Sequence, residues 1–518
     1  MLFLHDSGAL RTPAQRPGPR SRQLLHDNRG ATLVLVALAA TVLLGFTALG
    51  VETGLWYAVK RQDQSAADAA ALSGAYERAA GQPYSQICGQ VKHDAAANGF
   101  TFQSYSCPSS SPACTSPSSG QMCANNPPVV GSNAGDDKAV EVILNRQQNT
   151  YLANLFLPSV TIGTRAVAKV NLPGYTCDLS LAQTGTGISV QGSATLNLTG
   201  CGIAANSSDA ASISFGGGNN DILNASWFQT VGNYSSNGSP VLNVPTRLTD
   251  STPVKDPYSP TCTPSTLGCV GPVIYQWPAT PAIPANPCYA DTITPTTLQP
   301  GLYGKISGSN KCSNNTGSSS PPMQFTKGTT TLCPGVYYLD GEDGKGYAFL
   351  VQGGTLQLGT AGSTTNGVTC PSNGISGVTI IAGSQTGTKG GGLQIKSGTV
   401  TLSAPTARIP SGCTLGSTPC IPSGILFYQD PADADTSKAG SGLTGDSTIT
   451  ANGTTSLLGA MYAPATNVTF TGNANSTCFI VISLTMSYQG DSTMSGNQAA
   501  CQAVGVTGPT VMNISLTE

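Results

Sequence analysis

Residues 298–303 have the sequence LQPGLY, and the pattern returns at residues 332–337 as LCPGVY. Across residues 175–518, short apolar or alternating runs are separated by Gly, Asn, Ser and Thr. Such runs predict strands, and a recurring phrase is typical of stacked coils that bury their apolar sides on one another. We therefore expect a mostly-β region over 175–518. A β-solenoid (β-helix) is favoured, and a β-sandwich is the alternative because the repeat is irregular.

The composition agrees with a β-rich chain of several domains. Charged residues make up 9% of the 518 residues, against about 25% in typical soluble domains. Abundant Gly and Pro disfavour long helices, and a chain of this length is expected to form two or more domains. The formal net charge of −2 leaves no electrostatic footprint for nucleic acid, so we expect no nucleic-acid partner.

One uncharged segment, residues 31–51, is long enough to cross a membrane as a helix of about 30 Å. Basic residues dominate upstream of it, at Arg11, Arg16, Arg20, Arg22 and Arg29. The positive-inside rule then keeps the N-terminus in the cytoplasm and exports the rest. Residues 1–29 are predicted to be a disordered cytoplasmic leader. A cleaved signal peptide is the alternative, although its apolar region would be shorter, about 7–15 residues.

All 16 cysteines follow the apolar segment, and their number is even. This pattern is typical of disulfides in an oxidising compartment. Cys413 with Cys420, and Cys262 with Cys269, could each close a small loop, but spacing leaves the full connectivity open. A zinc site is disfavoured because no CxxC occurs and His93 is the only histidine beyond the segment.

The apolar helix is expected to continue as a juxtamembrane helix, so that residues 30–80 form one rod. Alanine is abundant and proline is absent from 52–80, and the sequence Gly81-Gln82-Pro83 would end the helix. Residues with mostly small side chains recur on one side, at Leu55, Val59, Ala66, Ala70 and Ser73. They would let another helix approach closely, or alanine simply favours helix here.

Residues 81–174 predict a small α/β domain. We expect a short helix that begins near residue 85 and ends at Asn98-Gly99, a strand at 139–145, a helix at 146–158 and a strand at 159–170, with a loop at 104–128. The proline-rich stretch 237–290 in the β-rich region is predicted to be an excursion or linker.

The segment from residue 29 to residue 75 resembles the N-terminal part of TadE/TadG-like proteins of the Tad (Flp pilus assembly) system. That part combines an apolar helix, an acidic residue near Gly and aromatics, a basic pair, and a Gln-x-x-x-Asp-Ala-Ala-Ala-Leu motif. The matching residues are Glu52, Gly54, Trp56, Tyr57, Lys60, Arg61, Gln64, Asp68, Ala69, Ala70, Ala71 and Leu72. Residues 139–170 resemble the small domain that follows this helix. Residues 177–208 resemble a segment of longer TadG-like proteins, and Cys177 and Cys201, which flank it, would pair.

The resemblance implies a non-catalytic role in assembling or anchoring a bacterial Tad pilus. It implies a single-pass inner-membrane protein whose C-terminal region faces the periplasm or cell envelope. Its partners would be other Tad assembly proteins or pilin, together with membrane lipid. The small residues of the motif would contact a partner helix. Asp68 would pair with a partner's base or with Lys60 or Arg61 of a neighbouring copy; a solvated Asp68 is the alternative.

The sequence departs from the family at two places. Pseudopilin-type relatives carry Glu five residues after the cleaved Gly, whereas Leu35 follows Gly30 at that distance. Some TadG-like proteins have an Asp-x-Ser-x-Ser metal motif, and residues 178–182, DLSLA, lack its last Ser.

Two alternative functions remain, a membrane-anchored adhesin and a carbohydrate-active β-solenoid enzyme. An enzyme would need clustered carboxylates. Acidic clusters occur at Asp340, Glu342 and Asp343 and at Asp430, Asp433 and Asp435. Each could bind Ca²⁺, but such acids are typical of solvated loops. We expect no enzyme, cofactor or small-molecule substrate. Aromatic residues gathered on one face, such as Tyr337 and Tyr338, would favour an adhesin that binds glycan.

Overall fold

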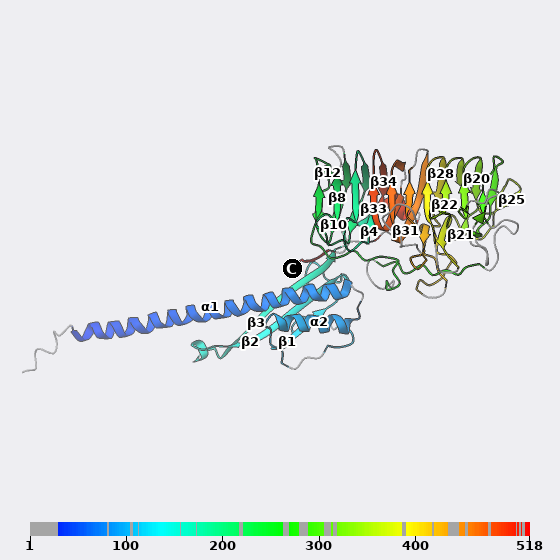
Figure 1. Cartoon of the computed structure of the whole chain (residues 1–518). Coiled ribbons are helices and arrows are strands. Elements are labelled where there is room, and N and C mark those ends of the chain that lie inside the picture. The colour runs from blue at the N-terminus through cyan, green and yellow to red at the C-terminus, as the bar shows by residue number, and fades with distance from the viewer. Residues whose placement is uncertain are drawn as a thin grey trace, which may run out of the picture.

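A computed structural model describes residues 29–79, 82–103, 107–111, 113–155, 157–171, 174–216, 221–262, 269–278, 288–304, 312–313, 319–385, 390–416, 419–433, 445–450, 454–474, 478–503, 505–506, 509 and 513–518. All but the last residue of the predicted leader, 1–29, lies outside the described residues. Figure 1 shows a long N-terminal helix, a small sheet beside its second half, and a large β-rich block.

Helix α1 (Arg29–Ala79) runs without a break through the apolar segment and the Ala-rich stretch. Alanine-rich sequence without proline favours this length. The helix is apolar enough to cross a membrane, and its most apolar 18-residue window is fully exposed. Helix α1 therefore has an exposed apolar half and a half that packs on the protein.

The second half of α1 packs on an antiparallel sheet with the order β1–β2–β3–β35. Its strands are β1 (Gln121–Asn125), β2 (Ala139–Asn149), β3 (Ser159–Asn171) and β35 (Asn513–Leu516). Helix α2 (Tyr84–Ala97) joins this core, which includes Ala66, Val91, Val140 and Ala168. Residues 513–516 were expected in the β-rich region, but they complete the small sheet instead.

The helix predicted over residues 146–158 is wrong. Strand β2 continues to Asn149 and pairs with β3 back to Ser159, and the 3₁₀ turn η1 (Ala153–Leu155) lies between them. Cross-strand partners along the whole hairpin override the local helix preference of this stretch.

The rest of the chain is mostly β. Its first strands are β4 (Tyr175–Ser180), β5 (Ile188–Gln191), β6 (Thr195–Thr199), β7 (Cys201–Ala205), β8 (Ile213–Gly216), β9 (Ile222–Ala225), β10 (Trp227–Thr230), β11 (Tyr234–Ser236), β12 (Val241–Asn243) and β13 (Thr246–Leu248). From β4 to β10, each strand pairs in parallel with the strand three positions later, so β4 pairs with β7 and β10 with β13.

The later strands also pair in parallel with strands further along the chain, for example β14 with β19 and β20 with β23. They are β14 (Tyr289–Ala290), β15 (Thr296–Leu298), β16 (Gly301–Gly304), β19 (Met323–Phe325), β20 (Thr329–Leu332), β21 (Gly335–Asp340), β22 (Tyr347–Val351), β23 (Thr355–Leu358), β26 (Val378–Gly383), β27 (Gly392–Ile395), β28 (Thr399–Ser403), β29 (Ile425–Gln429), β30 (Ser447–Ile449), β31 (Thr455–Phe470), β32 (Asn473–Ala474), β33 (Cys478–Tyr488) and β34 (Thr493–Asn497). Two antiparallel hairpins, β17 (Cys312–Ser313) with β18 (Ser319–Ser320) and β24 (Thr364–Thr365) with β25 (Val368–Thr369), and helix α3 (Gln498–Ala503) complete this part.

The repeated phrase lies on adjacent parallel strands. Leu298 in β15 pairs with Leu332 in β20. The rings of Tyr303 and Tyr337 stack with their centroids 5.8 Å apart. Each hydroxyl donates to the carbonyl four residues earlier, Tyr303 to Gln299 and Tyr337 to Cys333. Similar sequence therefore makes the same local structure twice.

The last strands of the β-rich region pair with its first. Strand β33 pairs in parallel with β4 and β5, and β34 pairs with β6. One hydrophobic core contains residues from both halves, including Ile188, Tyr337 and Met486. We call the contact of β33 and β34 with β4–β6 the seam.

The predicted excursion at 237–290 is partly strand, since it contains β12, β13 and β14. The chain between β13 and β14 packs against the sheet through Val254, Tyr258 and Val273. The Tyr258 ring lies 5.3 Å from the Tyr462 ring, and the Tyr462 hydroxyl donates to Asp256 at 2.8 Å. The described part of this crossing segment is therefore bound to the strands that it passes.

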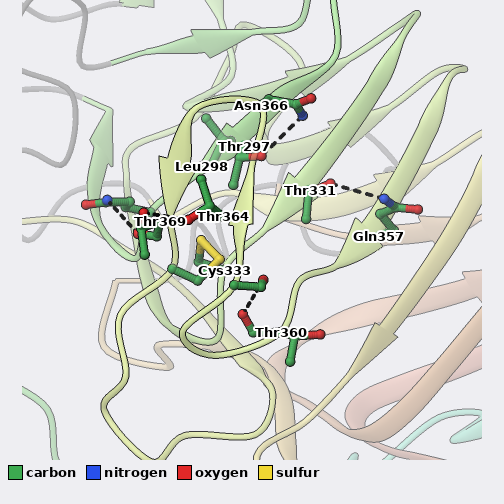
Figure 2. The surroundings of a disulfide bond; sticks show 12 residues. Thr297, Leu298, Thr331, Cys333, Gln357, Thr360, Thr364, Asn366 and Thr369 are labelled. Atoms are coloured by element: carbon green, nitrogen blue, oxygen red, sulfur yellow. Dashed lines mark hydrogen bonds between the residues drawn. A yellow bond between two sulfur atoms is a disulfide. The ribbon is translucent and has the colours of Figure 1, made fainter.

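Disulfides of the described part of the chain include the expected pairs Cys177–Cys201, Cys262–Cys269 and Cys413–Cys420. Figure 2 shows the Cys333–Cys370 bond. It holds the β24–β25 hairpin over neighbouring strands, where Asn366 Nδ2 donates to Thr297 Oγ1 at 3.2 Å. These disulfides join cysteines that are 7 to 37 residues apart in sequence, so they hold together segments that are close along the chain.

Asp178 in β4 lies at the seam and is fully buried, and its Oδ2 accepts a hydrogen bond of 2.7 Å from the Tyr488 hydroxyl. Burial raises the pKa of Asp178 from 3.8 to about 7. Between these values the folded chain keeps a proton that the unfolded chain releases. The free energy of unfolding therefore falls as the pH rises from about 4 to about 7.

We predict that Asp178→Asn, which has no proton to lose, flattens this dependence. The measurement is the urea midpoint of the full chain in detergent at about pH 5 and about pH 8. We expect the urea midpoint of the unchanged chain to fall more between these two pH values than the midpoint of the variant. Asp209→Asn is the control, because this exposed carboxylate binds only near the surface, at the Gly185 amide. An equal fall in Asp178→Asn and the unchanged chain would contradict the prediction.

Candidate functional site

The family motif lies where α1 meets the β2–β3 hairpin, and we call this contact the junction. Glu52 is buried although the apolar segment ends directly before it. Its carboxylate accepts hydrogen bonds from the backbone amides of Tyr151, Leu152 and Ala153, at 2.7, 3.2 and 2.7 Å. These amides open the η1 turn, and a carboxylate is a strong acceptor for such groups. Glu52 therefore fastens the tip of the hairpin to the helix.

Gln64 makes the second attachment. Its Nε2 donates to Asp68 Oδ1 at 2.8 Å and to the Arg165 carbonyl in β3 at 2.9 Å. Asp68 is half-buried and bound within its own chain, so it is not the fully solvated side chain of the alternative hypothesis. Its pairing with a neighbouring copy stays a prediction.

An ion pair that the sequence did not indicate lies between these attachments. Arg146 Nη2 lies 2.6 Å from the buried Asp63 Oδ1. Burial raises the pKa of Asp63, and the Arg146 guanidinium opposes this shift. The same guanidinium lies 5.3 Å from the centre of the Phe100 ring. The pair joins α1 to β2 at the middle of the hairpin.

The small residues of the motif pack within the chain. Ala70 and Ala71 are completely buried, and Leu72 packs against the same core. A Cβ on Gly74 would lie 2.7 Å from Val91 and 2.9 Å from Val140, so α1 approaches α2 and β2 closely here. We expected a partner helix on this surface, but Ala66, Ala70 and their neighbours cover the chain's own α2 and sheet.

The remaining motif residues lie just beyond Glu52. Trp56 is half-buried, and Tyr57 is exposed with the Arg61 guanidinium 5.8 Å from its ring centre. Both aromatics line an open hollow with Lys60 and Ile162. A Cβ on Gly54 would meet no atom within 4 Å, and nothing in the structure explains this glycine.

Glu141 in β2 is buried and accepts hydrogen bonds from side chains of neighbouring elements. Glu141 Oε1 accepts from Arg165 Nε at 2.5 Å and Glu141 Oε2 from Asn125 Nδ2 at 2.7 Å. Arg165 also binds Glu518, and hydrogen bonds from Ser132 and Arg165 hold the pKa of Glu518 at about 2. The alternating pattern of the strands does not predict these hydrogen bonds of Glu141 and Arg165, because the partners are distant in sequence.

Each of the two acidic clusters considered for catalysis contains carboxylates that accept hydrogen bonds from the protein itself. Asp343 accepts from the amides of Lys345 and Tyr347, and Asp433 accepts from the Ser384 amide. Asp430 accepts from the Tyr275 hydroxyl at 2.5 Å, and Asp435 lies outside the described residues. Among the described residues, no group of three His, Cys, Asp or Glu side chains is placed to hold a metal ion.

We predict that Glu52→Ala exposes the amides of residues 151–153 to faster hydrogen exchange. Hydrogen bonds to a charged group contribute about 1.5–3 kcal/mol, so protection falls at least about tenfold. Hydrogen exchange of the full chain in detergent, read by mass spectrometry, measures this. Thr53→Ala is the matched control, because that exposed hydroxyl bonds only within α1. Unchanged protection in Glu52→Ala would contradict the role of the carboxylate.

Comparison with known proteins agrees with the motif. No curated protein and no solved structure matches the chain significantly. Residues 30–79 match the model of the family described as "Putative Flp pilus-assembly TadE/G-like", a range that coincides with α1. The resemblance is thereby confirmed over α1, where the chain is similar to TadE/TadG-like proteins.

Proposed function

We propose that the chain is a non-catalytic component of Tad (Flp) pilus assembly or anchoring, held in the bacterial inner membrane by α1. The family match over α1 carries this proposal. The exposed apolar half of α1 supplies the single membrane span. The N-terminus would be cytoplasmic, and the β-rich region would lie in the periplasm or face the cell envelope, where its disulfides persist. Other Tad assembly proteins or pilin would be its partners.

We infer further that the β-rich region is a β-solenoid. Parallel pairing between strands three positions apart is what stacked three-strand coils produce, whereas β-sandwiches are built from antiparallel strands. Such a solenoid would start in the middle, at β4, and its last coil would return to the seam. Its role would be to present a rigid surface away from the membrane.

A membrane-anchored adhesin is the second candidate, and one observation favours it. The half-buried Tyr275, Trp277 and Tyr338 form a cluster on the β-rich region, with ring centres 5.7–6.0 Å apart. Partly exposed aromatics of this kind suit contact with glycan. Tyr337, by contrast, is buried in the core. A carbohydrate-active enzyme has less support, because Asp343, Asp430 and Asp433 accept hydrogen bonds from backbone amides or a tyrosine hydroxyl.

Electron microscopy of pili tests the assembly role. We predict that cells lacking the chain lose pili and that the full chain restores them. A chain in which a short linker joins β3 to β35 in place of the β-rich region keeps the four-stranded sheet, and it too restores pili if assembly resides in α1 and the small sheet. Normal pili in the deletion strain would contradict the assembly role and favour the adhesin.

A further inference from the structure

The tip of the β2–β3 hairpin presents apolar side chains to solvent. Tyr151, Leu152 and Leu157 are 70%, 59% and 44% exposed. The stretch 150–158 carries no charged residue. The tip is also a closed loop, because the Thr150 amide donates to the Pro158 carbonyl at 3.2 Å and the Leu157 amide to the Ala153 carbonyl at 2.8 Å. The exposed side chains are therefore held on an ordered turn.

The three hydrogen bonds that Glu52 accepts from the amides of residues 151–153 set the position of this tip along α1. Glu52 directly follows the apolar segment, whose length matches a bilayer core of about 30 Å. Figure 1 shows the hairpin beside α1, with its tip toward the apolar half of the helix. The tip thus lies at the level where the apolar segment ends.

Aromatic residues of α1 lie at the same level. Trp56 and Tyr57 follow Glu52 by about one helical turn, and Lys60 lines the same hollow. Trp and Tyr are enriched where transmembrane helices leave the bilayer, and lysine places its charge among the headgroups there. The exposed apolar side chains of the tip therefore lie at the same height along α1 as the end of the segment that lipid would surround.

We propose that the hairpin tip, through Tyr151, Leu152 and Leu157, inserts into the interface of the bilayer that α1 spans, as a second membrane contact. This inference rests on the proposed membrane anchoring. A single helix is free to rotate and tilt, whereas two contacts fastened together by Glu52 fix the direction in which the small sheet leaves the membrane.

Quenching of tryptophan fluorescence by lipid bromine tests this contact. The full chain carrying Trp56→Phe is reconstituted into vesicles of phosphatidylethanolamine and phosphatidylglycerol. These vesicles also contain phosphatidylcholine brominated near the headgroup end of its acyl chains. Leu152→Trp, or the more conservative Tyr151→Trp, then reports on the tip after subtraction of the emission of Trp227 and Trp277, recorded in the chain that carries Trp56→Phe alone. The expected result is quenching several times stronger than that of Tyr76→Trp, an exposed position about 36 Å further along α1.

Leu44→Trp, in the apolar half of α1, separates the two proposals. Quenching at Leu44→Trp without quenching at either tip position would overturn the tip contact while leaving the anchor intact. Absence of quenching at Leu44→Trp would show instead that α1 does not lie in the bilayer, and both proposals would fail.

Discussion

A carboxylate that follows an apolar helix must find hydrogen-bond donors, because burying an unpaired charge is strongly unfavourable. Glu52 finds three backbone amides at the tip of a hairpin that lies about a hundred residues later in the chain. These three hydrogen bonds fix the tip of the hairpin beside Glu52 on α1. Asp63 with Arg146, and Gln64 with β3, then keep the hairpin parallel to α1 for the rest of its length. The helix and the small sheet consequently form one body.

The β-rich region is attached to that body at two points. It begins after β3 and ends before β35, and these strands are antiparallel neighbours in the small sheet. The seam makes this possible, since it places the last strands of the region beside the first. The Thr176 amide also donates to the Pro509 carbonyl at 2.7 Å, which holds the outgoing and returning chain together. A region connected by two strands transmits orientation better than one connected by a single linker.

Local sequence predicted the parts that local interactions determine. The uninterrupted α1, the short disulfide loops and the pairing of the LQPGLY and LCPGVY strands depend on nearby residues or on a repeat. The helix predicted at 146–158 failed because distant partners decide that stretch: β3 pairs with it, and Glu52 binds its amides. The place of β35 was missed for the same reason. Nothing in residues 513–516 indicates that this strand pairs with β3, which lies more than three hundred residues earlier. At the junction, the motif identified Glu52 and Gln64 as important, while Asp63, Arg146 and Glu141 became visible only with their partners.

The burial of the motif changes what the helix can offer a partner. Alanines at the α1 surface were expected to receive another helix, yet α2 and β2 already cover them, and Gly74 allows that contact. Apolar and aromatic surfaces still exposed on this body include the apolar half of α1, the hollow beside Trp56 and Tyr57, and the hairpin tip. All three lie along the apolar segment or within about three helical turns beyond its end. Contacts with other pilus components through these three surfaces would therefore occur within the membrane or close to its surface.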